Sequence, residues 1–395
     1  MSRPVAITGA RIFDGWDWHE GCALLVRDGR VSALPPETAV PADAAVEAAG
    51  GALLVPGFID LQVNGGGGVL LNEDRSVEGL RRICAAHARF GTTAALPTLI
   101  TDTFDVRAEA IAAGFDAQAA GVPGFLGLHL EGPHLSLARK GVHDPALIRP
   151  MEARDLDAML ALAGRFPALM VTVAPENATV EQVAAMAAAG ITVSLGHSDT
   201  TYATAAAYAA AGARTVTHLF NAMSPLGHRE PGMVGAALDI GTLSAGIIAD
   251  GIHVDPVSMR VALEAKAGPG RIFLVTDAMS PIGTEEKGFF LNGREIFRKD
   301  GRLTLADGTL AGADIDMLSS VRFVHERLGL PLGEALRMAS LYPAEAVGLG
   351  ARKGRLGPGT DADFVVLTEG LDMVATYIGG ARVWSPSSRS AIASP

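Results

Sequence analysis

The chain from about residue 56 onward alternates between short apolar runs and longer segments rich in alanine. Eight apolar runs of strand length recur: GFIDLQV, TTAALPTL, GFLGLHLE, ALMVTVAP, ITVSLGH, RTVTHLF, LSAGIIAD and RIFLVTDA. Most of them are separated by segments of helical composition, such as residues 77–90, 181–190 and 201–213. Short apolar strands that alternate with helices indicate parallel βαβ units. Eight such units predict an α/β fold with a (β/α)8 TIM-like barrel over residues 56–354.

An open, doubly wound sheet is the alternative arrangement of the same units. We favour the barrel because no glycine-rich dinucleotide fingerprint follows the first strand. Between about residues 283 and 310 the pattern changes to a glycine-punctuated insertion that resembles hairpins. Two further helices, predicted near 314–329 and 332–348, would complete the outer ring.

The two ends of the chain share a different pattern. Apolar runs broken by turn residues occupy 5–15 and 22–34 near the N-terminus, and 361–370 and 373–384 near the C-terminus. Similar β-rich ends around a different middle predict one small β-sandwich-like domain, built from residues 1–55 and 355–395. The polar segment from residue 385 to the end is predicted to be disordered.

Composition narrows the classes of partner. The 395 residues carry a formal net charge of -11, which disfavours a nucleic-acid partner because its phosphates would be repelled. The two cysteines, Cys22 and Cys84, form no metal motif or disulfide framework, and a reducing cytoplasm is expected. The first ten residues lack a signal-peptide pattern, and no apolar run reaches the roughly 18 residues of a membrane helix. We therefore expect a cytoplasmic protein with no membrane partner.

Titratable residues collect where the predicted strands end, which is where barrel enzymes carry their chemistry. The residues at or just after the ends of the third, fifth, sixth, seventh and eighth strands are Glu131, His197, His218, His253 and Asp277. Each has a structural alternative: Glu131 could accept backbone hydrogen bonds in a turn, His197 could cap a helix, and His218 could be a core histidine. Five such groups converging on one mouth favour a site.

Glu131, His197 and His218 form a set of two imidazoles and one carboxylate. That set suits one divalent ion per subunit, with Zn²⁺ the best match and Fe²⁺, Mn²⁺ or Co²⁺ as alternatives. An ion held there lowers the pKa of a coordinated water and makes it a nucleophile. Asp277 would then serve as the general base and later the acid, although it could also be a fourth ligand or a helix cap. Neither a Walker-type phosphate loop nor a Gly-x-Ser-x-Gly elbow is present, so these two chemistries have no support.

The residues at these positions resemble the N-acetylglucosamine-6-phosphate deacetylases of the amidohydrolase superfamily. The resemblance rests on motifs in the family's order along nearly the whole barrel: VPGFIDLQVNGGGG, GLHLEGPHLSLARKGVHDP, SLGHSD, THLFNAMSPLGHREPG, GIIADGIHVD and LVTDAM. One departure is visible, since AGADIDM places Ala313 where the family has a small hydroxyl residue. Contacts of that loop therefore cannot be carried over.

The resemblance implies roles for particular residues. Glu131, His197 and His218 would bind the metal, Asp277 would be the catalytic base, and His143 would help polarise the acetyl carbonyl. The remaining substrate-binding residues would be Asn221, Ala222, Arg229 and His253. In the family, the arginine that corresponds to Arg229 reaches across a dimer interface, so a homodimer with shared sites is implied.

The implied reaction is metal-dependent hydrolysis of the acetamide of N-acetylglucosamine 6-phosphate, in the catabolism or recycling of amino sugars. Three alternatives stay open at this point. The substrate could be N-acetylgalactosamine 6-phosphate, which differs in one epimeric hydroxyl. The enzyme could be another amidohydrolase, such as a cyclic amidase. A non-catalytic scaffold is the third, but such a protein should have lost some of the ligands.

Gln62 and Asn64 share one face of the first strand, because alternate residues of a strand point the same way. By resemblance to the superfamily, they occupy the place where dinuclear amidohydrolases carry a His-x-His motif. Two amides are poor replacements for two imidazoles, so this pair predicts a site with one metal. Gln62 is also a candidate substrate contact, and the alternative for both residues is to hold the glycine-rich loop at 65–68.

Overall fold

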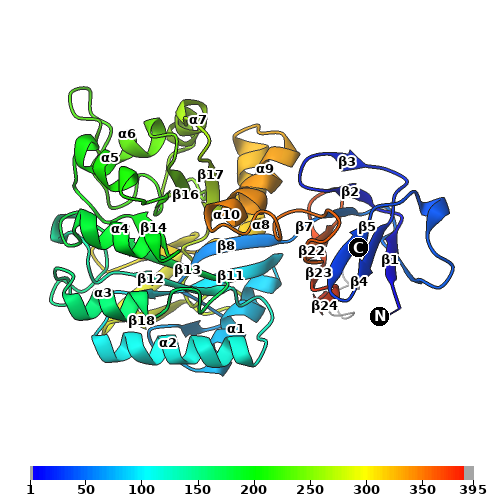
Figure 1. Cartoon of the computed structure of the whole chain (residues 1–395), viewed down its shortest axis with the longest axis horizontal. Coiled ribbons are helices and arrows are strands. Elements are labelled where there is room, and N and C mark those ends of the chain that lie inside the picture. The colour runs from blue at the N-terminus through cyan, green and yellow to red at the C-terminus, as the bar shows by residue number, and fades with distance from the viewer. Residues whose placement is uncertain (1–2, 387–395) are drawn as a thin grey trace.

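The computed structural model describes residues 3–386, and a parallel sheet of eight strands forms the core of its larger part (Figure 1). Consecutive strands along the chain are neighbours in this sheet. The strands are β8 (Phe58–Val63), β11 (Thr92–Ile100), β12 (Gly127–Glu131), β13 (Ala168–Val173), β14 (Thr192–Leu195), β15 (Thr215–Val216), β16 (Ser244–Ile248) and β17 (Ile272–Val275). Their residues are buried almost throughout, which explains why the sequence reads as apolar runs rather than as an alternating pattern.

The first and last strands of this sheet meet and close the barrel. The backbone N–H of Asp277 donates to the Gln62 carbonyl at 2.9 Å, and Val63 forms a parallel bridge with Ala278. Inside the closure, the Asp60 carboxylate accepts from the Thr276 hydroxyl at 2.5 Å and from the Thr276 N–H at 3.2 Å. Burial raises the pKa of Asp60 to about 7. The predicted barrel is confirmed, and the open-sheet alternative is wrong.

Helices follow most of the strands and form the outer layer (Figure 1). They are α1 (Val77–Ala88), α2 (Phe104–Ala119), α3 (Ala153–Leu160), α4 (Val180–Ala188), α5 (Tyr202–Ala210), α6 (Gly232–Asp239), α7 (Pro256–Ala265), α8 (Met317–Arg322), α9 (Leu332–Ala339) and α10 (Leu341–Ala346). Hydroxyl side chains cap several N-termini by accepting from the N–H three residues on, as Ser76 does for α1 and Thr103 for α2. Short 3₁₀ turns, η1 (Glu37–Ala39) and η2 (Leu137–Arg139), lie in loops.

The last two predicted helices are present, but each differs from the prediction in its details. The helix expected near 314–329 is α8 continued by a π-helical turn, η3 (Phe323–Arg327). The single helix expected near 332–348 is two helices, α9 and α10, which meet at Ser340 with φ of -133°. Pro343 accounts for the break, because its ring would clash with the carbonyl of Ala339 in a continuous helix.

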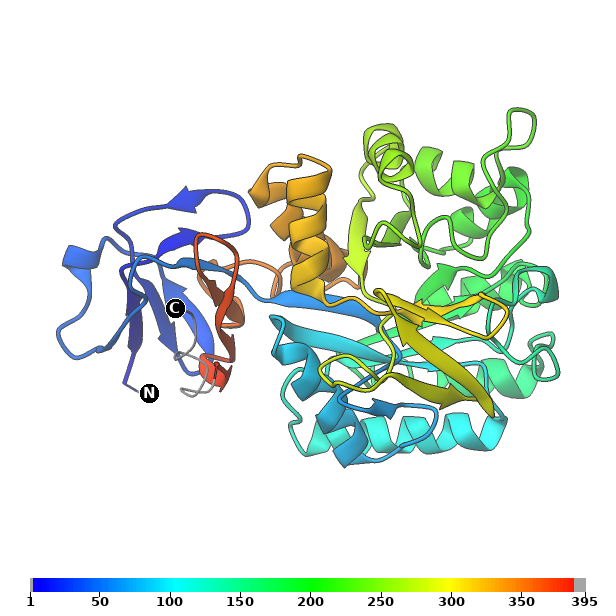
Figure 2. The same cartoon turned by 180° about the vertical axis from the view of Figure 1, so that it is seen from behind.

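The insertion after β17 forms an antiparallel sheet that lies against the side of the barrel (Figure 2). Its strands are β18 (Gly288–Leu291), β19 (Arg294–Lys299), β20 (Arg302–Thr304) and β21 (Leu310–Ala313). Buried residues of this sheet, including Leu291 and Ile296, share a small core with Ile100 and Met279. Two short strands, β9 (Gly65–Gly66) and β10 (Val69–Leu70), form a separate hairpin after β8.

Both ends of the chain build a second, smaller domain (Figure 1). One sheet contains β5 (Arg30–Ala33), β4 (Leu24–Arg27), β1 (Val5–Thr8) and β6 (Ala45–Ala48). The other contains β24 (Ala381–Trp384), β23 (Met373–Ile378), β22 (Phe364–Leu367), β7 (Leu53–Pro56), β2 (Arg11–Phe13) and β3 (Trp18–His19). Pairing of Val365 with Val55 joins the two termini in one sheet. Ile7 and Leu24 of the first sheet share a core with Leu54 and Phe364 of the second, so the sandwich-like arrangement is confirmed.

The domain boundaries at residues 55/56 and 354/355 stay a prediction. Most of the tail predicted to be disordered lies outside the described residues. Within residues 3–386, no helix is long and apolar enough to cross a membrane.

Candidate metal-binding and active site

Three ligand atoms from three strand ends lie within hydrogen-bonding distance of one another at the mouth of the barrel. Glu131 Oε1 is 3.2 Å from His197 Nε2 and 3.3 Å from His218 Nε2, and the two Nε2 atoms are 3.0 Å apart. All three side chains are buried. Ligands at about 2.1 Å from a tetrahedral ion lie about 3.4 Å from one another. The three atoms therefore already have nearly the spacing that an ion would impose.

A hydrogen bond of the His197 ring directs one lone pair to this point. His197 Nδ1 lies 2.8 Å from the Arg139 carbonyl, which can only accept, so Nδ1 carries the proton and Nε2 presents its lone pair. Burial opposes charge on His218, but the adjacent Glu131 outweighs it and raises the pKa of this histidine. Burial likewise opposes the charge on Glu131, yet His197 and His218 hold the pKa of its carboxyl well below the usual range. The cluster therefore favours positive charge at its centre.

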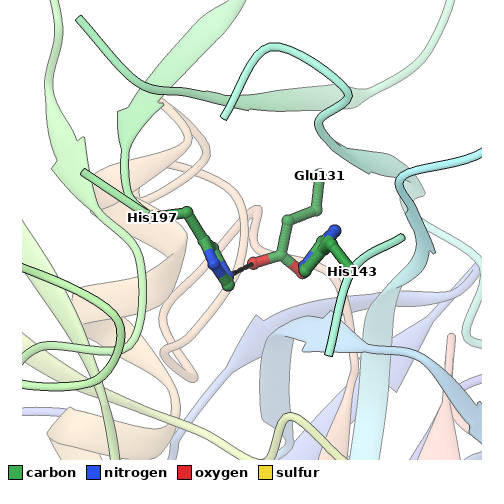
Figure 3. A group of neighbouring side chains, drawn as sticks. All are labelled: Glu131, His143 and His197. Carbon is green, nitrogen blue, oxygen red and sulfur yellow. Dashed lines mark ion pairs between the residues drawn. The ribbon is translucent and has the colours of Figure 1, made fainter. Parts of the chain in front are cut away.

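His143 offers a second way to complete a set of three. Ligand atoms of Glu131, His143 and His197 all lie within 4.8 Å of one another, and Figure 3 shows the two rings on either side of the carboxylate. However, His143 Nδ1 accepts from the Thr101 N–H at 3.3 Å and lies 2.7 Å from the Thr101 hydroxyl. Burial lowers the pKa of His143 to about 3, so the ring is neutral and its proton is on Nε2. That N–H makes His143 a hydrogen-bond donor, and the Glu131–His197–His218 set has the shorter distances.

Asp277 lies beside the cluster and is held by two amides. Its Oδ1 accepts from Asn64 Nδ2 at 2.6 Å and from Gln62 Nε2 at 3.1 Å. Gln62 Nε2 also lies 3.3 Å from each oxygen of Glu131, so this amide bridges the two carboxylates. Burial, and next the negative charge of Glu131, raise the pKa of Asp277. A raised pKa suits a carboxylate that takes and returns a proton.

A cavity of about 160 Å³ opens over these groups. Eight of the ten residues predicted for the site line it: Glu131, His143, His197, His218, Asn221, Ala222, His253 and Asp277. Gln62 is buried and does not line the cavity, but its amide contacts the Glu131 and Asp277 carboxylates. Arg229 lies on an exposed loop and is not part of the lining. Among the described residues that line the cavity, none is a lysine or an arginine.

Strained backbone marks the same positions. His197, His218 and Asp277, each just beyond a strand end, have left-handed φ values of 48°, 30° and 51°. Phe220 and Ala222 in the following loop have values of 77° and 49°. Non-glycine residues rarely adopt this region, and when they do they cluster at functional sites. The turns lift these side chains out of the strand direction and toward the cavity.

Several contributing residues were not predicted from the sequence. Asn64, which the sequence predicts to face the mouth with Gln62, does line the cavity, but its contact with Asp277 was not predicted. Asp250 Oδ2 lies 2.6 Å from His253 Nδ1, a partner that the i, i+3 spacing could have suggested. Thr101, just after β11, follows the same strand-end rule that found the others. Met279 and Leu310 line the cavity with no signal in the sequence beyond their hydrophobicity.

The histidines outside the predicted set have separate environments. His129 is fully buried inside the barrel, with Nε2 2.7 Å from the Thr172 hydroxyl and Nδ1 3.1 Å from the Leu61 carbonyl. His134 is buried in the loop after β12, and His228 is exposed.

Comparison with known proteins identifies the family. The model of the amidohydrolase family matches residues 53–383. The chain belongs to the amidohydrolase family. This amidohydrolase is 41% identical over 384 residues to N-acetylgalactosamine-6-phosphate deacetylase of Shewanella sp. (strain ANA-3), covering 95% of each chain. It is 36% identical over 378 residues to N-acetylglucosamine-6-phosphate deacetylase of Haemophilus influenzae, covering 95% of this chain and 98% of that one.

A solved structure extends the similarity to the whole amidohydrolase fold. The crystal structure of N-acetylglucosamine-6-phosphate deacetylase from Pasteurella multocida superposes with a TM-score of 0.92 at 36% identity. The match covers 96% of this chain and 99% of that chain, so both the barrel and the terminal β domain have counterparts.

Proposed function

We propose that this amidohydrolase removes the acetyl group from N-acetylglucosamine 6-phosphate and releases glucosamine 6-phosphate and acetate. The single observation that carries this proposal is the cluster of Glu131, His197 and His218 with Asp277 beside it in one cavity. The names of the relatives support the class of substrate.

Glu131, His197 and His218 are the residues we propose to hold one divalent ion, with Zn²⁺ the best match for two nitrogens and one oxygen. The spacing of the three ligand atoms and the lone pair that His197 Nε2 presents support this choice over a set that includes His143. When bound, such an ion activates water and polarises the acetyl carbonyl. Gln62 and Asn64 donate to carboxylates rather than present imidazoles, which supports a site with one ion.

Asp277 is the proposed general base and acid. Because both amides engage Oδ1, the other oxygen is available to take a proton from the attacking water. The water oxygen forms a bond to the acetyl carbon, and the C–N bond then breaks. Asp277 returns the proton to the leaving nitrogen, which departs as the amine while acetate is released.

His143 is the proposed donor to the acetyl oxygen. Thr101 occupies Nδ1, so the Nε2–H of a neutral ring is available in the cavity. A fixed donor of this kind stabilises the negative charge that develops on the carbonyl oxygen during attack.

Recognition of the phosphate is favoured by a lysine or an arginine, and the described lining of the cavity has neither. We propose that Arg229 of a second copy supplies it in a homodimer, next to His253, Asn221 and the backbone N–H of Ala222. The exposure of Arg229 and of the neighbouring Leu226, which is 55% exposed, supports this arrangement. An arginine is suited to this role because its planar fork can bind two phosphate oxygens.

N-Acetylgalactosamine 6-phosphate is the second candidate substrate. The specific observation in its favour is the 41% identity to a deacetylase named for that compound, against 36% for a relative named for the glucosamine compound. The two sugars differ in the orientation of one hydroxyl, so the chemistry proposed for Asp277 and His143 is the same for both.

Acetate release from each sugar phosphate, measured separately and in competition with metal-loaded protein, tests the proposal. We expect the glucosamine compound to have the larger kcat/KM. A larger value for the galactosamine compound would transfer the proposal to the second candidate, and no release from either would overturn both.

A further inference from the structure

A second cavity, of about 200 Å³, lies on the outside of the barrel. It is formed between the start of α2 and the segment that follows β12, and it shares no lining residue with the cavity over Asp277. Three arginines line it: Arg107 from α2, Arg149 from the loop that also carries His143, and Arg154 from α3. Three guanidinium groups around one small cavity indicate an anion as its ligand.

Arg107 has a donor that nothing satisfies. The residue is 4% exposed, and its Nη2 donates to Asp155 Oδ1 at 2.7 Å. Its Nη1 is buried and has no hydrogen-bond partner among residues 3–386. Buried charged donors are almost always paired, so an unpaired donor on a residue that lines a cavity points to a ligand.

The arginines around the cavity also share few acceptors. Arg149 donates to both oxygens of Asp155, at 2.5 and 2.8 Å, so Arg107 and Arg149 share one carboxylate. Arg154 is 63% exposed and pairs at 2.9 Å with the exposed Glu152, which holds it only weakly.

One carboxylate lines the cavity itself. Asp102 accepts from the Asn72 amide at 2.9 Å and from the Thr103 N–H at 2.8 Å, so both of its oxygens are engaged. Together with Asp155 and Glu152, Asp102 formally balances the three arginines, so the unmet donors rather than a net charge favour an anion here.

Two further features suit an oxyanion. The sixteen-residue helix α2 begins at the cavity, and the positive end of its dipole favours negative charge there. Phe104 forms part of the wall, with Arg107 and Arg154 at 5.0 and 5.8 Å from its ring centre. The ring packs against both guanidinium groups, and it offers an apolar surface to whatever carries the anion.

We propose that this cavity is a second binding site, for a phosphate group that is free or carried on a small sugar. The phosphate oxygens accept from Arg107 Nη1 and from the exposed fork of Arg154, and they supply acceptors that the single carboxylate of Asp155 cannot. Because Ala146, Leu147 and Arg149 belong to the loop that carries His143, the ligand holds this loop against α2 and α3.

Hydrogen exchange of the full chain, with inorganic phosphate or glucosamine 6-phosphate as the probe, tests the site. Phosphate in either form is expected to slow amide exchange in residues 102–107 and 149–154, which lie outside the cavity over Asp277. Arg154→Gln should raise the phosphate concentration needed for half-protection about tenfold, because it removes one charged donor. Arg107→Lys should raise it at least as much, because lysine lacks the fork.

The matched control is Arg81→Gln, which removes another surface arginine that is paired with a glutamate three residues away. It should leave the protection unchanged.

Stronger protection by the sugar phosphate than by inorganic phosphate would identify the sugar as part of the ligand, and equal protection would identify phosphate alone; both support the site. Protection by neither probe, or equal protection in wild type and Arg154→Gln, overturns it. Arg154 is exposed, so this variant folds even if Arg107→Lys does not, and the readout requires no turnover, which keeps it independent of the proposed function.

Discussion

Two buried polar clusters in this protein lack opposite kinds of hydrogen-bonding or ligand partner. At the mouth of the barrel, Glu131, His197 and His218 bring acceptors to within 3.0–3.3 Å of one another. Outside the barrel, Arg107 and Arg149 surround Asp155 with more donors than it can satisfy. Excess acceptors attract a cation and excess donors attract an anion, so each cluster indicates the charge of its ligand.

The two clusters also differ in how the fold assembles them. The acceptors come from the ends of parallel strands, which the closed barrel brings together at one mouth. The residues of the second cluster come from two helices and a loop, and no rule of strand order brings them together. The first cluster is therefore predictable from the order of elements, whereas the second becomes visible only in three dimensions.

The largest expected effect is on kcat, from a substitution of Asp277 beside the acceptor cluster. Asp277→Asn should lower kcat by about 10²–10⁴-fold, because the amide cannot take a proton from water. Acetate release measures the loss, and metal content measured on the same sample is the control, since Asp277 is not one of the proposed ligands. Unimpaired turnover in this variant would remove Asp277 from the mechanism.

The next largest effect, on metal content, distinguishes between the two candidate sets of three metal ligands. His197→Ala and His218→Ala should each lose tightly bound metal, measured as ions per chain after dialysis. His143→Ala should keep one ion per chain and lose about 10²–10³-fold in kcat, as expected for an oxyanion donor. Metal loss in His143→Ala with metal retained in His218→Ala would reverse the assignment.

Dimers that combine two variant chains test whether Arg229 acts across the interface. Asp277→Asn and Arg229→Gln chains should each be impaired alone, because each lacks one part of every site. After denaturation and joint refolding, about half of the dimers pair one chain of each kind, and such a dimer contains one intact site if Arg229 acts across the interface. Activity should recover to about a quarter of wild type. Recovery should be absent if Arg229 acts within its own chain.

A substitution in the donor cluster, in which Arg107 and Arg149 surround Asp155, should have the smallest effect on activity. Its main effect should be on stability. Asp155→Asn should lower the free energy of unfolding by about 3 kcal/mol, because it leaves buried guanidinium groups without a carboxylate. Chemical denaturation measures this change, and metal content should stay at the wild-type value.

The pH dependence of stability follows from the same carboxylate. Burial alone would raise the pKa of Asp155, but Arg149 and Arg107 outweigh it and hold the pKa well below the usual range. A lowered pKa in the folded state contributes stability above the unfolded value of about 3.9, and this stability is lost as the pH falls below it. The wild-type free energy of unfolding should therefore fall more steeply than that of Asp155→Asn between about pH 5 and pH 2. Parallel curves would contradict the charge assignment of this cluster.

Much of the fold was predictable because buried elements have a simple apolar pattern in the sequence. Strands covered on both faces read as continuous apolar runs, and eight of them with intervening helices predict a barrel. The helix near 332–348 was mispredicted at Ser340, because alanine-rich composition on both sides of Pro343 conceals the break. Eight of the ten predicted site residues line one cavity, since strand ends of a barrel share one face.

The sequence by itself determined the family, the barrel, and the identity of the acceptors at its mouth, because residue type and position along a strand are enough for these. Only the tertiary structure decided which nitrogen of His143 bears a proton, that Gln62 bridges Glu131 and Asp277, and that Arg107 retains a free donor. These properties depend on partners far away in the chain, such as Thr101 for His143 and Asp155 for Arg107. Hydrogen bonding and charge balance act over a few ångströms in space, and separation along the sequence does not report that distance.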